Sequence, residues 1–291
     1  MRLTLLHNLG AGRGFSLEHL LAELEEHGHE LVRAVDNHTD VAQLRQPSID
    51  AVVVAGGDAT VATAVVALTG QPTPLAILPV GTANNIARSL GIAAGSLPEM
   101  IARWDGAREM KADTGVLAGA WGDACFVEGV GGGVVADGMA ALSSSVADSP
   151  GDRDTALKRA LEGFRTTLSH AEATRWTYRI DGVPFTEDLL LFEVLNMRSV
   201  GPVLQLSPDA DPTDGRLSVV TAGEDQRAAL DRYLLERINN APATIALPHR
   251  AGTVIEIDRP GALHVDDGVR RVKAGDRVSL RVDAGSFVVL C

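Results

Sequence analysis

Apolar positions in the first third of the chain follow two alternating patterns. Residues 2–7, 51–55 and 75–78 are short apolar runs that predict strands, and 51–55 is a continuous run typical of a strand buried on both faces of a parallel sheet. Between them, the leucines of residues 17–24 recur at helical spacing, and further helices follow. Strands and helices in alternation predict a parallel, doubly wound α/β domain over residues 1–112.

After residue 112 the pattern changes to short strands bounded by Gly, Asp and Pro. Helical spacing interrupts these strands over residues 154–169 and 225–237. Many short strands separated by turns predict an antiparallel β-sandwich over residues 113–283. We expect a cleft between the two domains, and we regard the strand at about 284–291 as a candidate to return to the first domain.

The composition indicates a folded, acidic protein. Of 291 residues, 45% are hydrophobic and 22% are charged, which excludes disorder as the dominant state. Lys and Arg number 26 against 38 Asp and Glu, and the net charge of −12 repels nucleic acid and anionic lipid surfaces. Cys125 and Cys291 are too few for a disulfide framework, which favours a reducing compartment. We therefore expect a cytoplasmic protein that binds no nucleic acid.

The sequence offers little sign of stable membrane attachment. No apolar run approaches the length of about 20 residues that a bilayer-spanning helix needs, and the first residues do not read as a signal peptide. Contact with a membrane would therefore be transient. The oligomeric state is left open, with a homodimer as one option.

The sharpest motif is the run Gly56-Gly57-Asp58-Ala59-Thr60, at the junction of a buried strand and a predicted helix. Free N–H groups and the helix dipole favour an anion at such a junction, and glycine allows a phosphate to approach the backbone. An acidic residue there indicates a nucleotide that carries Mg²⁺ rather than a bare phosphate. The alternative interpretation is that Asp58 or Thr60 only caps the helix.

Two more turns have the same character. Residues 79–88 form another junction of strand, glycine turn and helix, with Gly81, Thr82 and Asn84 in the turn, and residues 8–14 form a glycine-rich loop after the first strand. The carboxyl ends of parallel strands meet at one edge of a sheet, where ligands bind. We therefore expect the three turns to line one site.

The two strongest turns resemble the diacylglycerol kinase catalytic-domain family, which includes bacterial soluble lipid kinases and the sphingosine and ceramide kinases. The family's Gly-Gly-Asp-Gly-Thr is similar to residues 56–60, with Ala59 in place of the last glycine. Its Pro-x-Gly-Thr-x-Asn-Asp-x-Ala-Arg is similar to residues 79–88, with Asn85 in place of the aspartate. The two motifs together are specific to this family.

Weaker similarity extends along the rest of the chain. The family's opening Asn-Pro-x-Ser-Gly keeps only its ends in residues 8–12. The glycine-rich residues 126–133 and the Asp-Gly turn within residues 207–217 are similar to further family segments. These three segments alone would not identify the family.

The resemblance implies an ATP site at the three turns of the first domain, with Asp58 facing the Mg²⁺ of the nucleotide. The residues that would cradle ATP are Asn8, Leu9, Gly10, Ala11 and Gly12 from the first turn, Gly56, Gly57, Asp58, Ala59, Thr60 and Thr63 from the second, and Gly81, Thr82 and Asn84 from the third.

The resemblance also implies a second, structural metal site at the Asp-Gly turn. By position it would use the carboxylate of Asp214 with backbone groups near Asp211 and Arg216. A hard cation with oxygen ligands suits such a turn. An Asx turn that joins two strands without a metal is the alternative.

The catalytic base is where this sequence departs from the family. The family uses the glutamate of an Asp-Gly-Glu to take the proton from the lipid hydroxyl. Here Asp266 aligns with the aspartate, and Gly268 or Val269 stands where the glutamate is expected. Asp266 or Asp267 is the candidate base, and the alternative is a solvated hairpin turn in a weakened kinase.

The sequence therefore predicts an ATP- and Mg²⁺-dependent kinase of a hydroxyl group, most readily of a diacylglycerol- or sphingoid-like lipid. An NAD-kinase-like enzyme is one alternative, because that family shares the Gly-Gly-Asp turn. A regulatory nucleotide-binding protein is another, because the glutamate is missing. The net charge of −12 argues against an acidic bilayer unless a local basic face, such as Lys158, Arg159 and Arg165, offsets it.

Overall fold

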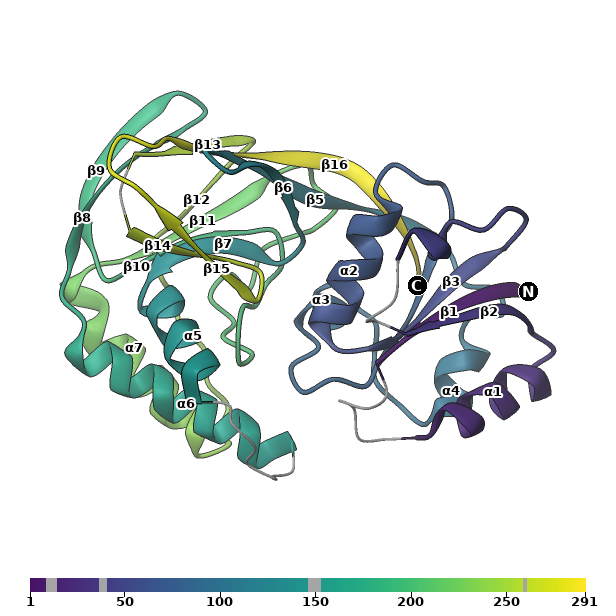
Figure 1. The fold of residues 1–291 in the computed structure, drawn as a ribbon. Helices are drawn as coiled ribbons and strands as arrows, with labels where there is room; N and C mark the ends of the chain where they lie inside the picture. The colour runs from purple at the N-terminus through teal and green to yellow at the C-terminus, as the bar shows by residue number, and fades with distance from the viewer. Residues whose placement is uncertain (9–14, 37–40, 146–152, 259–260) are drawn as a thin grey trace. The chain divides into compact units, whose positions relative to one another are not determined.

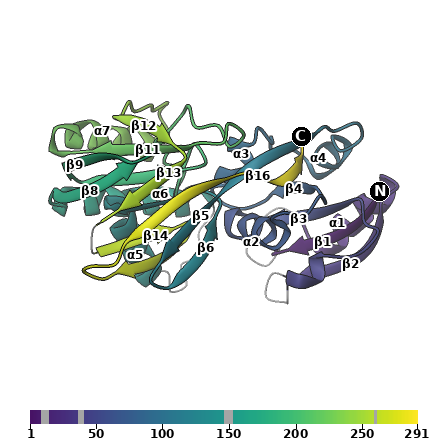
Figure 2. The same ribbon diagram turned by 90° about the horizontal axis from the view of Figure 1, so that it is seen from above.

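The computed structural model describes residues 1–8, 15–36, 41–145, 153–258 and 261–291. The chain divides into two compact units. Unit 1 comprises Met1–Thr114 and Ala284–Cys291, and unit 2 comprises Gly115–Asp283. Figures 1 and 2 show the helices and strands of each unit in two views.

Unit 1 is built on a parallel sheet. Its first four strands lie in the order β2-β1-β3-β4, and the end of β16 pairs with β4 in parallel, with Val289 opposite Leu75. The bounds are β1 (Arg2–His7), β2 (Glu30–Asp36), β3 (Ala51–Gly56), β4 (Leu75–Pro79) and β16 (Val278–Leu290). Every residue of β3 and β4 is buried, as continuous apolar runs predict for central parallel strands.

Helices cover both faces of this sheet (Figure 1). They are α1 (Leu17–Glu26), the 3₁₀ turn η1 (Val41–Leu44), α2 (Asp58–Leu68), α3 (Asn85–Ser89) and α4 (Leu97–Ala102). Leu20 and Leu24 of α1 pack with Leu97 and Ile101 of α4 against one face of the sheet. The helix α2 covers the other face and buries Val61 and Val65. The doubly wound arrangement is confirmed.

Unit 2 contains strands of two sheets. In one, β16, β13, β8 and β9 follow in that order, with β5 beside β16 and β6 beside β5. The other is antiparallel in the order β12-β11-β10-β7-β14-β15. The bounds are β5 (Glu109–Gly119), β6 (Gly122–Phe126), β7 (Gly129–Gly133), β8 (Thr174–Ile180), β9 (Val183–Leu189), β10 (Leu191–Leu195), β11 (Leu217–Ala222), β12 (His249–Gly252), β13 (Val254–Ile257), β14 (Gly261–Val265) and β15 (Gly268–Val272).

A core of buried apolar residues separates the two sheets of unit 2. Trp176 of β8 stacks on Phe192 of β10 with ring centroids 4.7 Å apart, and Tyr178 meets the same phenylalanine edge-on. Aromatic pairs of this kind stabilise a sandwich through large apolar burial. The predicted β-sandwich is confirmed.

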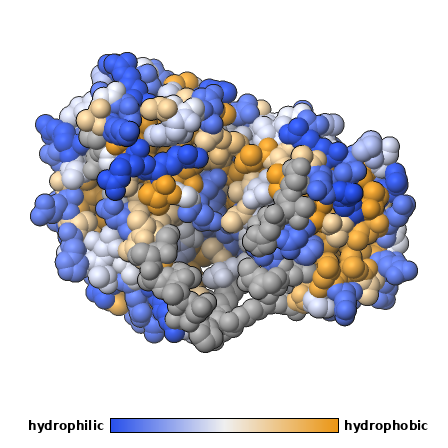
Figure 3. Space-filling model, viewed as in Figure 1, coloured by the Kyte–Doolittle hydropathy of each residue, from blue (hydrophilic) through white to orange (hydrophobic). Residues whose placement is uncertain are grey.

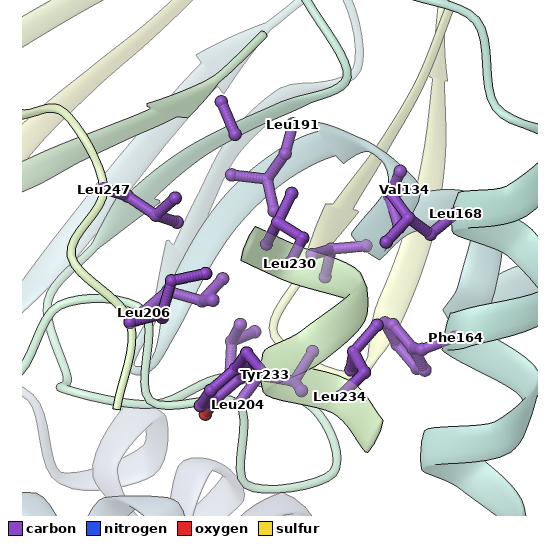
Figure 4. Close-up of a cluster of buried hydrophobic side chains, with 14 of the residues drawn as sticks. Val134, Phe164, Leu168, Leu191, Leu204, Leu206, Leu230, Tyr233, Leu234 and Leu247 are labelled. Atoms are coloured by element: carbon purple, nitrogen blue, oxygen red, sulfur yellow. The ribbon is translucent and has the colours of Figure 1, made fainter. Parts of the chain in front are cut away.

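Three helices pack on the other face of the six-stranded sheet: α5 (Val134–Ser145), α6 (Arg153–His170) and α7 (Arg227–Ile238), the last preceded by the 3₁₀ turn η2 (Glu224–Gln226). Leu161, Phe164 and Leu168 of α6 are buried in this cluster, which Figure 4 shows together with residues of α7. The helical spacing of residues 154–169 therefore marks a core-facing helix. The helix α5 was not predicted.

Candidate active site

Two strand-to-helix turns of unit 1 meet at glycines. Gly57 precedes α2 in extended backbone, and Gly81 lies in the turn between β4 and α3. A Cβ atom on Gly81 would lie 2.2 Å from the Cα of Gly57, closer than such atoms approach each other. Only glycine therefore allows the turns after β3 and β4 to pack backbone against backbone. The sequence predicted that these turns share one edge of the sheet, and the structure brings them into contact.

Asn84 fixes the second turn from within. Its backbone is left-handed, with φ of 54°. Its Oδ1 accepts the N–H of Gly81 at 3.0 Å, and its Nδ2 donates to the carbonyls of Pro79 and Gly81 at 3.1 and 2.9 Å. Asparagine tolerates left-handed backbone because its side chain can bond locally. The buried amide of Asn84 thus shapes the loop, and its backbone carbonyl starts α3 by accepting the N–H of Arg88 at 3.1 Å.

Asp58 joins the two helix starts. It is the first residue of α2, and its Oδ1 accepts the N–H of Ile86 in the first turn of α3 at 2.9 Å. A carboxylate near two helix N-termini is stabilised by their dipoles. One oxygen of Asp58 therefore has a structural role in the turn, in addition to the Mg²⁺ contact that the resemblance implies.

The remaining predicted nucleotide residues have mixed surroundings. Thr60 is buried against Gly56, and the hydroxyl of Thr63 donates to the carbonyl of Ala59 at 2.8 Å. Thr82 is exposed. Asn8 continues β1 and donates its N–H to the carbonyl of Ala55 at 3.0 Å. Leu9, Gly10, Ala11 and Gly12 lie outside the described residues.

In unit 2, Asp266 anchors the hairpin turn that the sequence singled out. Val265 pairs with Gly268 across β14 and β15, so Asp266 and Asp267 are the two residues of the turn, and Asp266 has a φ of 47°. The Asp266 carboxylate accepts the consecutive N–H groups of residues 127–129, at distances of 2.7–3.2 Å. Successive N–H groups of this kind form an anion-binding concavity. Both oxygens of Asp266 are therefore engaged by backbone.

Desolvation raises the pKa of both carboxyl groups of the turn. The pKa of Asp266 rises to about 6, although the backbone N–H donors favour its charged form. The pKa of Asp267 is also raised, with the positive charge of His264 opposing the shift, although Asp267 is the more exposed of the two residues. Gly268 is one of the two positions, with Val269, at which the resemblance places the family's glutamate. Among the described residues, an added Cβ at Gly268 would have the carbonyl of Val265 as its neighbour, at 3.4 Å.

A buried ionisable pair behind the turn escaped the sequence analysis. Glu193 of β10 and His264 of β14 are both 0% exposed, and His264 Nε2 lies 2.6 Å from Glu193 Oε2. Both residues lie opposite Gly131 of β7. Glu193 stands inside the apolar run of residues 189–195, which reads simply as a buried strand. The only signal was that single charge within the run.

The predicted structural metal site shows Asx turns. Asp211 Oδ1 accepts both the N–H and the hydroxyl of Thr213, at 3.0 and 2.7 Å. Asp214 Oδ1 accepts the N–H of Arg216 at 2.9 Å. Among the residues that the structure describes, no group of three or more His, Cys, Asp or Glu side chains is placed to hold a metal ion. The geometry matches the alternative interpretation, and a metal at Asp214 stays a prediction.

The surface of the described chain agrees with a protein that carries many charges. Figure 3 shows hydrophilic residues over much of the viewed face, with smaller hydrophobic areas between them. Lys158 and Arg159 of α6 are exposed, whereas Arg165 is paired with Asp231 of α7 at 2.7 Å. None of the helices within the described ranges is long and apolar enough to cross a membrane.

Similarity to known proteins is consistent along the chain. Residues 2–117 match the model of the diacylglycerol kinase catalytic domain. A diacylglycerol kinase of Mycobacterium tuberculosis is 29% identical over 253 residues, covering 79% of this chain and 76% of that protein. A diacylglycerol kinase of Bacillus subtilis is 28% identical over 242 residues, covering 75% of this chain and 73% of that protein.

Solved structures share the fold. A diacylglycerol kinase from Bacillus anthracis has a TM-score of 0.71 at 20% identity and covers 99% of this chain and 96% of its own. Yeast NADH kinase, solved with NADH, has a TM-score of 0.56 at 9% identity and covers 100% of this chain and 82% of its own. The resemblance predicted from the two glycine turns is confirmed, and the chain is similar to the diacylglycerol kinase catalytic-domain family in residues 2–117 and in its overall fold.

Proposed function

We propose that this protein is a kinase of the diacylglycerol kinase type, which uses ATP and Mg²⁺ to phosphorylate a hydroxyl group of a lipid. The observation that carries the proposal is the contact of Gly57 with Gly81, which joins the two family motifs into one backbone surface. Family similarity over residues 2–117 supports the nucleotide half of the proposal. The names of the bacterial relatives support the lipid half.

The nucleotide would bind at the turns of unit 1 through backbone rather than through large side chains. Gly57 and Gly81 lie backbone against backbone, and glycine in such a turn allows a phosphate to approach the main chain. The N-terminus of α2 supplies a positive dipole end. Asp58, with one oxygen fixed by the N–H of Ile86, is the residue that would hold Mg²⁺, which neutralises the phosphates.

The transfer requires a group that takes a proton from the acceptor. As the acceptor oxygen forms its bond to the γ-phosphorus, the bond from that phosphorus to the oxygen of ADP breaks, and the hydroxyl proton leaves. We assign the proton to the carboxylate of Asp267, because it is exposed at the tip of the hairpin. Asp266 is the less suitable candidate, because its oxygens accept the N–H groups of residues 127–129.

A lipid acceptor has to be compatible with an acidic protein. The net charge of −12 repels anionic headgroups on average. In the suggested basic face of α6, Arg165 forms an ion pair with Asp231. Lys158 and Arg159 are the exposed cations of that face. We therefore expect a neutral acceptor such as a diacylglycerol to be preferred over lipids in a strongly anionic bilayer.

Transfer of label tests the proposed function directly. The protein is incubated with γ-labelled ATP, Mg²⁺ and either neutral diacylglycerol in mixed micelles or NAD. Label in a chloroform-soluble product supports the lipid kinase. Label in NADP supports an NAD-kinase-like activity, which is tested because the chain shares its fold with yeast NADH kinase. Absence of label in both, with Mg-ATP still raising the melting temperature, would support the regulatory nucleotide-binding protein instead.

Asp58→Ala tests the nucleotide site. We expect this variant to lose stabilisation by Mg-ATP in a thermal shift experiment while it keeps the fold, because a turn carboxylate buries little apolar surface. Asp50→Ala is the matched control, since Asp50 also accepts one backbone N–H, that of Arg2 at 2.6 Å, but precedes β3 at the other end of the strand. Equal loss of Mg-ATP stabilisation in both variants would contradict the assignment.

A further inference from the structure

The buried pair of Glu193 and His264 lies on the helix-covered face of the six-stranded sheet. Glu193 and His264 flank the same residue of β7, Gly131, in the pairing register. A Cβ on Gly131 would lie 2.2 Å from the carboxyl carbon of Glu193. The glycine therefore provides the space in which the carboxylate and the imidazole meet across the central strand.

The partners of the imidazole determine where its protons lie. His264 Nδ1 is 3.2 Å from the carbonyl oxygen of Asp266, and a carbonyl only accepts, so Nδ1 carries a hydrogen. His264 Nε2 is 2.6 Å from Glu193 Oε2, within hydrogen-bond distance of the carboxyl group. Both ring nitrogens are thus engaged, and the ring is fixed at both ends.

The pair connects to the hairpin turn through backbone. The backbone carbonyl of Asp266 accepts a hydrogen bond from His264 Nδ1. The carboxylate of Asp266 accepts the N–H groups of residues 127–129. The N–H of Asp266 in turn donates to the carbonyl of Gly129 at 2.9 Å. The N–H, the carbonyl and the carboxylate of Asp266 therefore all have hydrogen-bond partners. Asp267 directly follows this fixed residue in the turn.

A gain in folding stability does not by itself explain the buried pair of Glu193 and His264. Burying a carboxylate and an imidazole removes both from water, and apolar residues of similar volume commonly stabilise a protein at least as well as such a pair. His264 is flanked in β14 by Leu263 and Val265, which pack in the core between the sheets. A buried pair that ends on the turn carrying Asp267 is better explained by a role in orienting that turn.

We propose that His264, held by Glu193, is a positioning residue that fixes the Asp266–Asp267 turn in the orientation needed for proton transfer. The proposal rests on the proposed kinase function, in which Asp267 takes the proton. It assigns no contact with substrate to either residue, because both are 0% exposed. In this chain the pair would stiffen a turn after which neither Gly268 nor Val269 supplies the glutamate that the resemblance leads one to expect.

Glu193→Gln and His264→Asn test the proposal in the full chain. The glutamine side chain keeps an oxygen that can accept from Nε2 but loses the charge, and the asparagine side chain keeps a donor for the Asp266 carbonyl but cannot reach Glu193. Two readouts are compared: kcat against KM for ATP, and amide hydrogen exchange at residues 127–129. We expect kcat to fall about tenfold in each variant with KM for ATP unchanged, as for loss of an orienting partner, and exchange at these amides to accelerate.

Tyr178→Phe is the control for a lost buried polar contact elsewhere in unit 2. Tyr178 donates to Glu187 at 2.5 Å on the other sheet. This variant should leave both kcat and exchange at residues 127–129 unchanged. Unchanged exchange in Glu193→Gln and His264→Asn would overturn the proposal, as would faster exchange with an unaltered kcat. A wild-type protein without kinase activity would overturn the proposed function and the catalytic part of this inference, whereas local acceleration of exchange would still show that the pair holds the turn.

Discussion

Gly81 in unit 1 and Gly131 in unit 2 are both positions where a Cβ atom has no room, yet different atoms occupy the space. At Gly81 the nearest atoms are the backbone of Gly57 and the Oδ1 of Asn84, and the close approach packs two turns together. At Gly131 the neighbour is the carboxyl group of Glu193. The first glycine lets two turns pack backbone against backbone, and the second makes room for a buried carboxyl group.

The difference shows what a glycine-rich run can and cannot indicate. In residues 56–60 and 79–88, glycine stands at the junction of strand and helix, where N–H groups are free for an anion. In Gly129–Gly133 of β7, glycine stands inside a strand, and the ladder uses the backbone groups. Such a strand glycine marks a close approach of side chains from neighbouring strands.

Gly131→Ala should give the largest change. The added methyl would collide with the Glu193 carboxyl group, and we expect the free energy of unfolding to fall by about 3 kcal/mol, as in an overpacked core. Chemical denaturation measures it. In the double variant with Glu193→Ala the space is restored, so the two changes should cost less together than their sum, by about 1 kcal/mol. Additive costs would mean that Glu193 does not fill this space.

Gly81→Ala should mainly weaken the binding of Mg-ATP. The methyl would separate the two turns, and we expect stabilisation by Mg-ATP to disappear while unit 2 keeps its stability. Thermal shift with and without Mg-ATP measures this effect. Gly163→Ala is the control, because it replaces a glycine within α6 and a Cβ there would meet Leu142, the neighbour found among the described residues, at an ordinary 3.6 Å. Unaltered Mg-ATP stabilisation in Gly81→Ala would contradict the assigned site.

Asp266→Asn should alter the pH dependence of stability. Burial raises the pKa of Asp266 in the folded state from its ordinary 3.8 to about 6, so the folded protein binds more protons than the unfolded chain between these values. The contribution of Asp266 is thus complete below pH 3.8 and is lost as the pH rises through 6. Denaturation of wild type and Asp266→Asn over this range measures it. Parallel curves would show that the carboxyl group titrates normally.

Arg165→Gln should have the smallest effect. Arg165 of α6 and Asp231 of α7 form an ion pair whose side chains are 41% and 43% exposed, in contrast to the fully buried Glu193 and His264. Exposed ion pairs contribute little to stability, so the unfolding free energy should change far less than in Gly131→Ala. A loss as large as that of Gly131→Ala would show that the helices of unit 2 depend on this pair.

The regular elements were largely predictable because their patterns are local. The buried strand β3 and the amphipathic spacing of α6 follow from residues close together in the sequence. The helix α5 was missed because it directly follows the glycine-rich β7 and contains Gly138. A glycine within a helix lowers the helical signal, although here Gly138 leaves room for the ring of Phe164.

The site was predictable in unit 1 and only partly so in unit 2. The turns of unit 1 are identified by motifs that span a few residues each. His264 and Glu193 are 71 residues apart in the sequence. Asp266 accepts the N–H of Val127, which is 139 residues away in the sequence. No local pattern connects such partners, because the register of a six-stranded sheet brings them together. Asp266 and Asp267 were identified only through their place beside the family's missing glutamate.

The parallel pairing of β16 with β4 has a consequence for biosynthesis. Residues 284–290 are synthesised only after all of unit 2, and until then β4 has an unpaired edge in the sheet of unit 1. An apolar edge strand with free N–H and carbonyl groups is prone to pair with another chain. The nascent protein therefore exposes this edge throughout the synthesis of its second half, and chaperone binding at β4 would protect it during that interval.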